Sequence, residues 1–530
     1  MNWLDYTVIV LYLGGLLSFG FLFRNQTSEK DYFLGGRQLG WFPLSLSVMA
    51  TQLSAISFVS APAFVGLREG GGLKWLTYEL AVPLAMLFVM FVIAPALYRS
   101  GHFSIYSFLE DRFGRSTRML VSVFFQIVRG FATGMMVYAM AIILEAVIGI
   151  PYWQSVVVVG VVTLLYSAMG GMKAVVWSDA IQMFLIFGGL VAVAIFALND
   201  VGGVSSFVEQ VDRSRLMTID WNSFGFSNDE FGFLPMLFGG FVLYASYYGC
   251  DQSQAQRILA AKDLSAVRRL LLANGLMRFP IVVLYCVVGL IVGVSVVNDP
   301  GLMSSIPADR PDFMLPVYIL ERLPNGVIGL LIVAILSAAM SSVSSAINSL
   351  AAVTLDDLQT TGLLKRDETR VVSRARNASI IWGVAILGVS FFGGSIAPTV
   401  IEGINKIGSA LYGPVLGVFA MAILLPRTNP TGVNIGLICG LAVNLMLWNF
   451  APQIFWMWWN LIGLVVTCGL AIGLTAALGK RESRANPVAE TEGDATDRDR
   501  GGMVVILCAA FALMILTGLA FNTIASASLP

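Results

Sequence analysis

Charged residues are scarce in this sequence. Asp, Glu, Lys and Arg together make up 12% of its 530 residues, whereas a soluble domain carries about 25%. Hydrophobic residues account for 57%, and the mean hydropathy is +0.80. A chain of this composition cannot hide its apolar surface inside an aqueous globule. We therefore expect an integral membrane protein.

Histidine and paired cysteines are also lacking. The only histidine, His102, falls in a basic loop, which excludes a histidine-based metal centre. The five cysteines lie in or beside apolar segments without paired spacing, so we interpret them as small hydrophobic packing residues. Acidic and basic side chains balance at 32 each, and nothing indicates nucleic-acid binding.

Long apolar runs dominate what is present. A membrane-spanning helix needs about 20 apolar residues, and we predict about fourteen such helices, among them 152–169, 177–198 and 375–394. The first run, "MNWLDYTVIVLYLGGLLSFGFLF", lacks the basic start and cleavage site of a signal peptide, so we expect a retained span. With the N-terminus outside, most Lys and Arg fall in cytoplasmic loops. We predict an all-α, multi-pass protein of the cell membrane. Its compact loops favour a bacterial inner membrane.

Four ionisable residues interrupt apolar runs: Glu79, Arg129, Asp179 and Lys406. Charged groups at membrane depth cost at least ~2.5 kcal/mol each on insertion scales and usually belong to functional sites. The alternative is that each side chain reaches the membrane interface or pairs with a charge on another helix.

Serines cluster in "ILSAAMSSVSSAINSL", residues 335–350. On a helix several of these hydroxyls share one face. They either bond back to their own helix and allow close packing, or they bind an alkali cation together with carbonyls freed by a broken neighbouring helix. The run "FPLSLSVMATQLSAISFVSAPAFVG" is the candidate broken helix, because it mixes polar, Pro and β-branched residues.

Four motifs in order resemble the sodium/solute symporter family: "DYFLGGRQLGWFPLSLSVMATQLSAISFVSAP", "YSAMGGMKAVVWSDAIQMFLIFGG", "DQSQAQRILAAKD" and "LSAAMSSVSSAINSLAAVTLDD". The resemblance implies a leucine-transporter-like fold with two inverted five-helix repeats, residues 41–198 and 233–424, the first opening with a broken helix. One extra helix and a cytoplasmic loop then occupy 1–40, and an extracellular loop 199–232. Three further helices occupy 425–530, with a disordered cytoplasmic loop at 479–502.

The same resemblance implies Na⁺ as the coupling ion, with no organic cofactor. The positions that match the family's main sodium site are Ala50, Leu53, Ala338, Ser341 and Ser342. Those that match the second sodium site of some members are Ser344, Ser345 and Asp179. Two sodium ions per cycle are therefore compatible with the sequence.

Solute-binding positions are also implied by the resemblance. They are Gln52, Ser54, Ser57, Glu79, Arg129, Lys406, Asp251 and Tyr247. Arg129 is similar in position to the arginine that pairs with the carboxylate in sialic-acid transporters. Asp251 replaces an asparagine common in the family, which weakens a sugar assignment, and Tyr247 is either a gate or a packing residue.

The net charge of the predicted solute-binding residues ranks the candidate solutes. Arg129 and Lys406 outweigh Glu79, and a solute carboxylate would neutralise the surplus. We therefore predict a Na⁺-coupled symporter of a small carboxylate such as a sugar acid or sialic-acid-like compound. If Asp251 also faces the pocket, the surplus disappears and a neutral sugar becomes the alternative. A membrane sensor or channel is a more distant alternative. An enzyme is not indicated, because no nucleophile–base pair is present.

Overall fold

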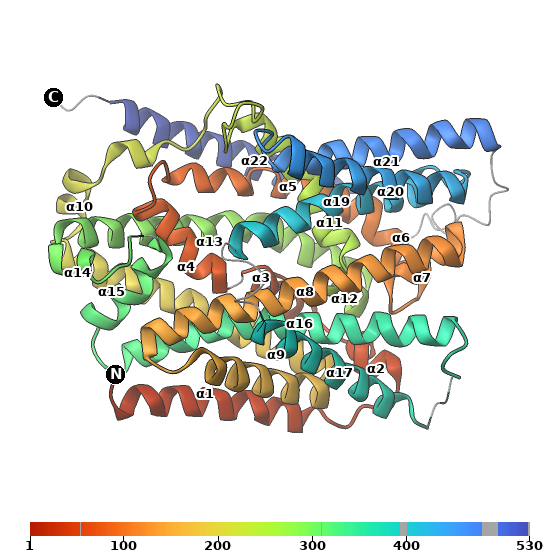
Figure 1. The fold of residues 1–530 in the computed structure, drawn as a ribbon, viewed down its shortest axis with the longest axis horizontal. Helices are drawn as coiled ribbons and strands as arrows, with labels where there is room; N and C mark the ends of the chain where they lie inside the picture. Colours follow the sequence, from red (N-terminus) through yellow and green to blue (C-terminus); the bar gives the residue numbers. More distant parts are fainter. Residues whose placement is uncertain are drawn as a thin grey trace.

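Helices make up every regular element of the described chain (Figure 1). The computed structural model describes residues 1–53, 55–308, 310–365, 367, 369–392, 400–479 and 497–527. The long helices are α1 (Trp3–Leu22), α8 (Arg115–Ile148), α9 (Tyr152–Asp200), α11 (Phe233–Cys250), α13 (Leu264–Asn298), α16 (Val327–Thr360), α17 (Val371–Phe391), α19 (Val400–Leu424), α20 (Pro430–Phe450), α21 (Met457–Leu478) and α22 (Asp497–Ser526). The shorter elements used below are α3 (Trp41–Gln52), α4 (Ala55–Gly66), η2 (Leu73–Glu79), α5 (Val82–Phe88), η3 (Val89–Ile93), α6 (Ala94–Ser100), α7 (Ile105–Phe113) and α12 (Gln252–Ala260).

The all-α membrane architecture is confirmed, but the number of spans needs comment. In the described residues, 11 helices are long and apolar enough to cross a membrane, or 12 if the bent pair α3 and α4 is one span. Two of the predicted spans, 152–169 and 177–198, fall within the single 49-residue helix α9. The predicted 375–394 corresponds to α17, which is not among the 11. The predicted total of about fourteen is therefore not confirmed by this count.

Gly171 divides α9 into two antiparallel halves. A straight helix of this length would be more than twice as long as the ~30 Å hydrocarbon layer is thick. Gly171 has φ +56° and ψ −152°, outside the helical region. Before it, Tyr166 donates a hydrogen bond to the carbonyl of Met340 in α16. After it, Gly189 lies against Ala334 of the same helix, so the chain doubles back along α16.

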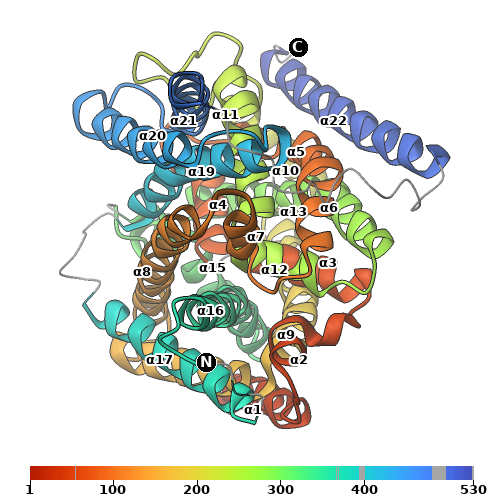
Figure 2. The same ribbon diagram turned by 90° about the vertical axis from the view of Figure 1, so that its right-hand side faces the viewer.

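Helix α16 lies inside the bundle, whereas α1 and α22 lie at its edge (Figure 2). It carries the serine cluster, and Ser341, Ser342, Ser344 and Ser345 are all buried. Its neighbours include α1, α3, α8, α9 and α17. The hydroxyls therefore face protein and not lipid, as a site inside the bundle requires.

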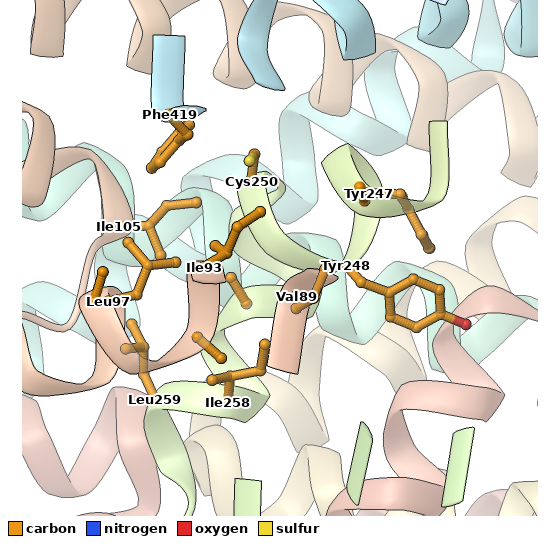
Figure 3. Close-up of a cluster of buried hydrophobic side chains, with 14 of the residues drawn as sticks. Val89, Ile93, Leu97, Ile105, Tyr247, Tyr248, Cys250, Ile258, Leu259 and Phe419 are labelled. Atoms are coloured by element: carbon orange, nitrogen blue, oxygen red, sulfur yellow. The ribbon is translucent and has the colours of Figure 1, made fainter. Parts of the chain in front are cut away.

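A second interruption separates α11 from α12 at Asp251, whose backbone is extended, with φ −94° and ψ 122°. Apolar side chains pack around it: Cys250 ends α11, Ile258 belongs to α12, and Ile93 and Leu97 belong to η3 and α6 (Figure 3). The break is thus held in a dense core. An interrupted helix is tolerated at membrane depth only where protein or a cavity surrounds it.

The turn at Gly171 is directly testable. A Cβ at this position would lie 2.7 Å from the carbonyl oxygen of Tyr32, and its φ disfavours any other residue. We expect Gly171→Ala to lower the free energy of unfolding by about 1–3 kcal/mol and to lower the Tm of the detergent-purified protein. Gly188→Ala is the control, because it lies in the same helix and nothing lies within 4 Å of the new Cβ. Equal Tm values for the two variants would contradict the requirement for glycine at the turn.

Candidate functional site

The first break lies between α3 and α4, which are bent by 60° relative to each other. Leu53 follows α3 with φ −78° and ψ 81°, so the helical hydrogen-bond pattern ends there. The last carbonyls of α3 consequently lose their partners in the same helix. This is the interruption predicted from the composition of the segment.

Serines of α16 meet these carbonyls. Ser341 Oγ donates to the carbonyl of Ala50 at 2.9 Å and lies 3.2 Å from that of Ala338. Ser342 Oγ lies 3.1 Å from the carbonyl oxygen of Thr51 and 3.4 Å from that of Ala338. Four of the five residues predicted for the main sodium site thus lie together. Thr51, which the sequence analysis did not include, adds a carbonyl.

Only neutral oxygens compose this cluster. Hard cations such as Na⁺ prefer carbonyl and hydroxyl oxygens, and both kinds converge here. The described residues contain no group of three or more His, Cys, Asp or Glu side chains placed to hold a metal ion. Within that part of the chain, the arrangement suits an alkali cation better than a transition metal.

A charged network lies next to this cluster. Asp179 Oδ2 accepts hydrogen bonds from Ser47 Oγ at 2.6 Å and from Arg257 Nη2 at 3.2 Å. Ser345 Oγ lies 2.8 Å from Thr51 Oγ1 and also accepts from Arg257. Asp179 and Ser345 are thus brought together as predicted. Ser344 instead donates within its own helix, to the carbonyl of Ser341 at 3.1 Å.

Arg257 was missed by the sequence analysis. Its position after "DQSQAQ" places it with the basic residues of a cytoplasmic loop, but its side chain is only 1% exposed. Asp179 Oδ1 is buried and has no hydrogen-bond partner among the described residues. The network therefore pairs one carboxylate with one guanidinium and leaves one acceptor oxygen available.

A cavity of about 250 Å³ opens beside the first break. The predicted solute-binding residues on its wall are Gln52, Ser57, Glu79, Arg129 and Tyr247. Asp251 and Lys406 are not among its lining residues, and Ser54 lies outside the described residues. The predicted solute site and the serine cluster thus share the interrupted helix.

Glu79 forms a buried ion pair with Arg278 of α13. Both carboxylate oxygens take part, at 2.9 Å from Nε and 3.1 Å from Nη2. The third guanidinium nitrogen, Nη1, is buried without a hydrogen-bond partner among the described residues. Arg278 also lines the cavity. The sequence analysis did not include Arg278, although a charged residue within an apolar run is a signal.

Arg129 reaches toward the second break. Its Nη1 lies 3.7 Å from Asp251 Oδ2, while Asp251 Oδ1 accepts the backbone N–H of Ser253 and caps α12. The sequence analysis predicted only the first interruption. An acidic residue that can cap a helix, placed inside an apolar span, was the available signal for the second.

This geometry changes the charge count on which the solute ranking depended. Glu79 is already neutralised by Arg278, and Asp251 stands next to Arg129. The surplus positive charge expected from Arg129 and Lys406 is therefore not a property of the cavity wall. What remains are guanidinium N–H groups without acceptors: Nη1 of Arg278 and Nε of Arg129, within the described residues.

Aromatic rings enclose the cavity. Tyr247 accepts a hydrogen bond from Gln254 at 2.9 Å and packs against Tyr412 with ring centroids 6.0 Å apart. Trp456, which precedes α21, stacks on Tyr78 at the η2 end of the cavity, at 6.1 Å. Tyr247 therefore both packs against Tyr412 and lines the cavity.

Known proteins resemble this chain over most of its length. The profile of the sodium:solute symporter family matches residues 32–440. The human sodium/iodide cotransporter is 33% identical over 450 residues, which cover 83% of this chain and 69% of the relative. The human sodium-coupled monocarboxylate transporter 1 is 30% identical over 444 residues, which cover 82% and 71%.

Solved structures show the same fold. A Na⁺-coupled sialic acid symporter in a substrate-bound, outward-open state superimposes with a TM-score of 0.82 at 23% identity, covering 91% of this chain and all of that one. The nucleobase-cation-symport-1 transporter Mhp1 superimposes with a TM-score of 0.57 at 12% identity, covering 86% and 95%. The leucine-transporter-like fold is thereby confirmed. On the profile match and the identity to these relatives, the chain belongs to the sodium:solute symporter family.

Proposed function

We propose that this protein is a secondary active transporter that couples Na⁺ entry to the uptake of a small organic anion bearing a carboxylate. The observation that carries the proposal is a cavity with two arginines on its wall, next to a cluster of serine hydroxyls and freed carbonyls. Relatives named for iodide and monocarboxylate transport, both anions, support this class of solute.

Sodium would bind at the junction of α3 and α16. There Ser341 and Ser342 would turn their lone pairs toward the ion, and the carbonyls of Ala50, Leu53 and Ala338 would complete the shell. The ion would join the two helices, and its release would free them to move apart, which is the link that alternating access needs. Each Na⁺ that enters contributes ~2.3 kcal/mol per 100 mV of inward-negative potential.

A second sodium would bind between Asp179 and Ser345. Asp179 Oδ1, which no described residue hydrogen-bonds, is the acceptor that supports this site, and Ser344 is the predicted third member. Arg257 already pairs with the other carboxylate oxygen, so the ion would share the carboxylate with the guanidinium.

The N-terminus would lie on the outer side of the cell membrane, and the solute would enter from that side.

The solute carboxylate would lie between Arg129 and Arg278. Guanidinium–carboxylate hydrogen bonds are among the stronger ones in proteins, and each arginine has a nitrogen without an acceptor in the part of the chain that the structure describes. Glu79 and Asp251 hold the two guanidinium groups in place by pairing with their other nitrogens. Because these acids also balance the charge, a neutral sugar is the second candidate solute.

The sodium site is tested with Ser342→Ala. We expect the apparent affinity for Na⁺ in proteoliposome uptake to fall at least about tenfold, or ~1.4 kcal/mol, because one oxygen of the shell is lost. Ser349→Ala is the matched control, since this buried serine of α16 donates to the carbonyl of Ala346 in its own helix. Equal sodium affinity in the two variants would contradict the site.

The second sodium is tested through the Hill coefficient for Na⁺. A value near two in the unaltered protein should fall to about one in Ser345→Ala, and likewise in Asp179→Asn. The serine variant is the cleaner one, because the asparagine leaves Arg257 buried without its counter-ion. A coefficient unchanged by Ser345→Ala would place any second ion elsewhere.

The solute class is tested by thermal shift. The purified protein is screened against sugars, sugar acids, amino acids and short carboxylates, each in Na⁺ and in K⁺. We expect carboxylates to raise the Tm in Na⁺ only, and Arg129→Gln to raise the KM for the best acid at least about tenfold, because a charge-assisted hydrogen bond is lost. A rise in Tm with sugars alone, together with an equal KM in Arg129→Gln and the unaltered protein, would favour the neutral solute.

A further inference from the structure

Helix α1 lies at the edge of the bundle, outside the two predicted repeats, yet it packs against both α9 and α16 (Figure 2). Asp5 of α1 accepts hydrogen bonds at Oδ1 from the N–H groups of Gly326 and Gly329, at the start of α16, at 2.6 and 2.8 Å. These are N–H groups that a helix cannot satisfy within itself. Asp5 is fully buried, so α1 caps the serine helix and fixes its own height along it.

Two turns further along α1, the hydroxyl of Tyr12 joins α16 to α9. Its oxygen accepts a hydrogen bond from Ser337 Oγ of α16 at 2.9 Å and another from Gln182 Nε2 of α9 at 3.0 Å. An amide group is planar, so a bond that fixes Nε2 of Gln182 also fixes the direction of its oxygen, Oε1. Tyr12 therefore determines where this oxygen points.

Gln182 Oε1 has no hydrogen-bond partner in the part of the chain that the structure describes, and the same holds for Asp179 Oδ1. Both side chains are fully buried. They are three positions apart on α9, so they lie on one face of the helix. A buried acceptor without a donor is costly, and two neighbouring acceptors, one of them charged, favour a cation between them.

We propose that Gln182 Oε1 is a further ligand of the second sodium ion, and that Tyr12 of α1 is the positioning residue that presents this oxygen to the ion. The proposal rests on the proposed function, which places that ion between Asp179 and Ser345. Carboxylate, amide and hydroxyl oxygens are the ligands that hard cations prefer. Tyr12 would act without touching the ion, as the groups that orient metal ligands do.

The ion affinity of the carrier would then depend on a helix outside its repeats. Ser337 donates to the same hydroxyl oxygen and comes from the serine helix, so Tyr12 would also hold α9 and α16 at the separation that the second ion needs. The prediction is specific, because Tyr12 should affect the second ion and not the main sodium site at Ser341 and Ser342.

The experiment measures equilibrium binding of radiolabelled Na⁺ to the full-length purified protein, without solute. We expect about two ions per chain in the unaltered protein. Gln182→Met keeps the length of the side chain and removes the oxygen, and it should weaken binding of one ion at least about tenfold. Tyr12→Phe removes only the hydroxyl and should weaken binding of the same ion about three- to tenfold. Tyr6→Phe, at a residue 48% exposed on the same helix, is the matched control and should bind like the unaltered protein.

A second readout separates positioning from general stability. The Tm of each variant is measured in Na⁺ and in K⁺. A purely structural role for Tyr12 would lower the Tm equally in the two salts. We expect the rise in Tm that Na⁺ produces over K⁺ to shrink in Tyr12→Phe and in Gln182→Met, and to be unchanged in Tyr6→Phe.

The outcomes separate this inference from the proposed function. If Ser345→Ala loses one bound ion while Gln182→Met and Tyr12→Phe bind Na⁺ like the unaltered protein, the second sodium stands and this inference is overturned. If Gln182→Met loses the ion but Tyr12→Phe does not, the positioning role of Tyr12 is overturned. If the unaltered protein binds a single ion that Ser342→Ala removes, the second sodium of the proposed function is wrong, and the inference fails with it.

Discussion

Backbone groups cannot remain unpaired where there is no water, and this constraint explains the centre of the molecule. Helices are interrupted inside the bundle at two places, after Gln52 and at Asp251, and each break frees carbonyl or N–H groups. Ser341 and Ser342 bond to the carbonyls of the first break, and the Asp251 side chain caps the second. The serine hydroxyls and the capping aspartate are polar, and both need burial among other helices. The serine helix is therefore placed inside the bundle and not at its edge.

The membrane class and the broken first helix could be predicted, because composition and the hydrophobic runs report them directly. The serine cluster was also identifiable, since hydroxyls are conspicuous in an apolar span. The turn at Gly171 was implied by two separate predicted spans, and the structure places a non-helical residue between the two halves of α9. The second break was missed because a single capping aspartate resembles any other polar residue in a sequence.

Ion pairs were the part that the sequence could not predict. Glu79 and Arg278 are 199 positions apart in the sequence, and Asp179 and Arg257 are 78 apart, yet both pairs are buried. Arg129 and Asp251 are also far apart in the sequence, and the half-buried arginine lies beside the buried aspartate. A charge count along the chain treats each group as isolated, so it overstated the surplus of positive charge at the predicted solute site. Pairing depends on which helix faces which, and only the packed bundle determines that.

Trp456 gives the terminal helices a place at the cavity proposed for the solute. It precedes α21, outside the two predicted repeats, and yet it stacks on Tyr78 at one end of that cavity. A part of the chain that a minimal ten-helix carrier would not need thus contributes to the wall of this cavity. Evolution can then retune what such a carrier accepts by altering an appended segment, while the machinery that couples it to the ion gradient is left untouched.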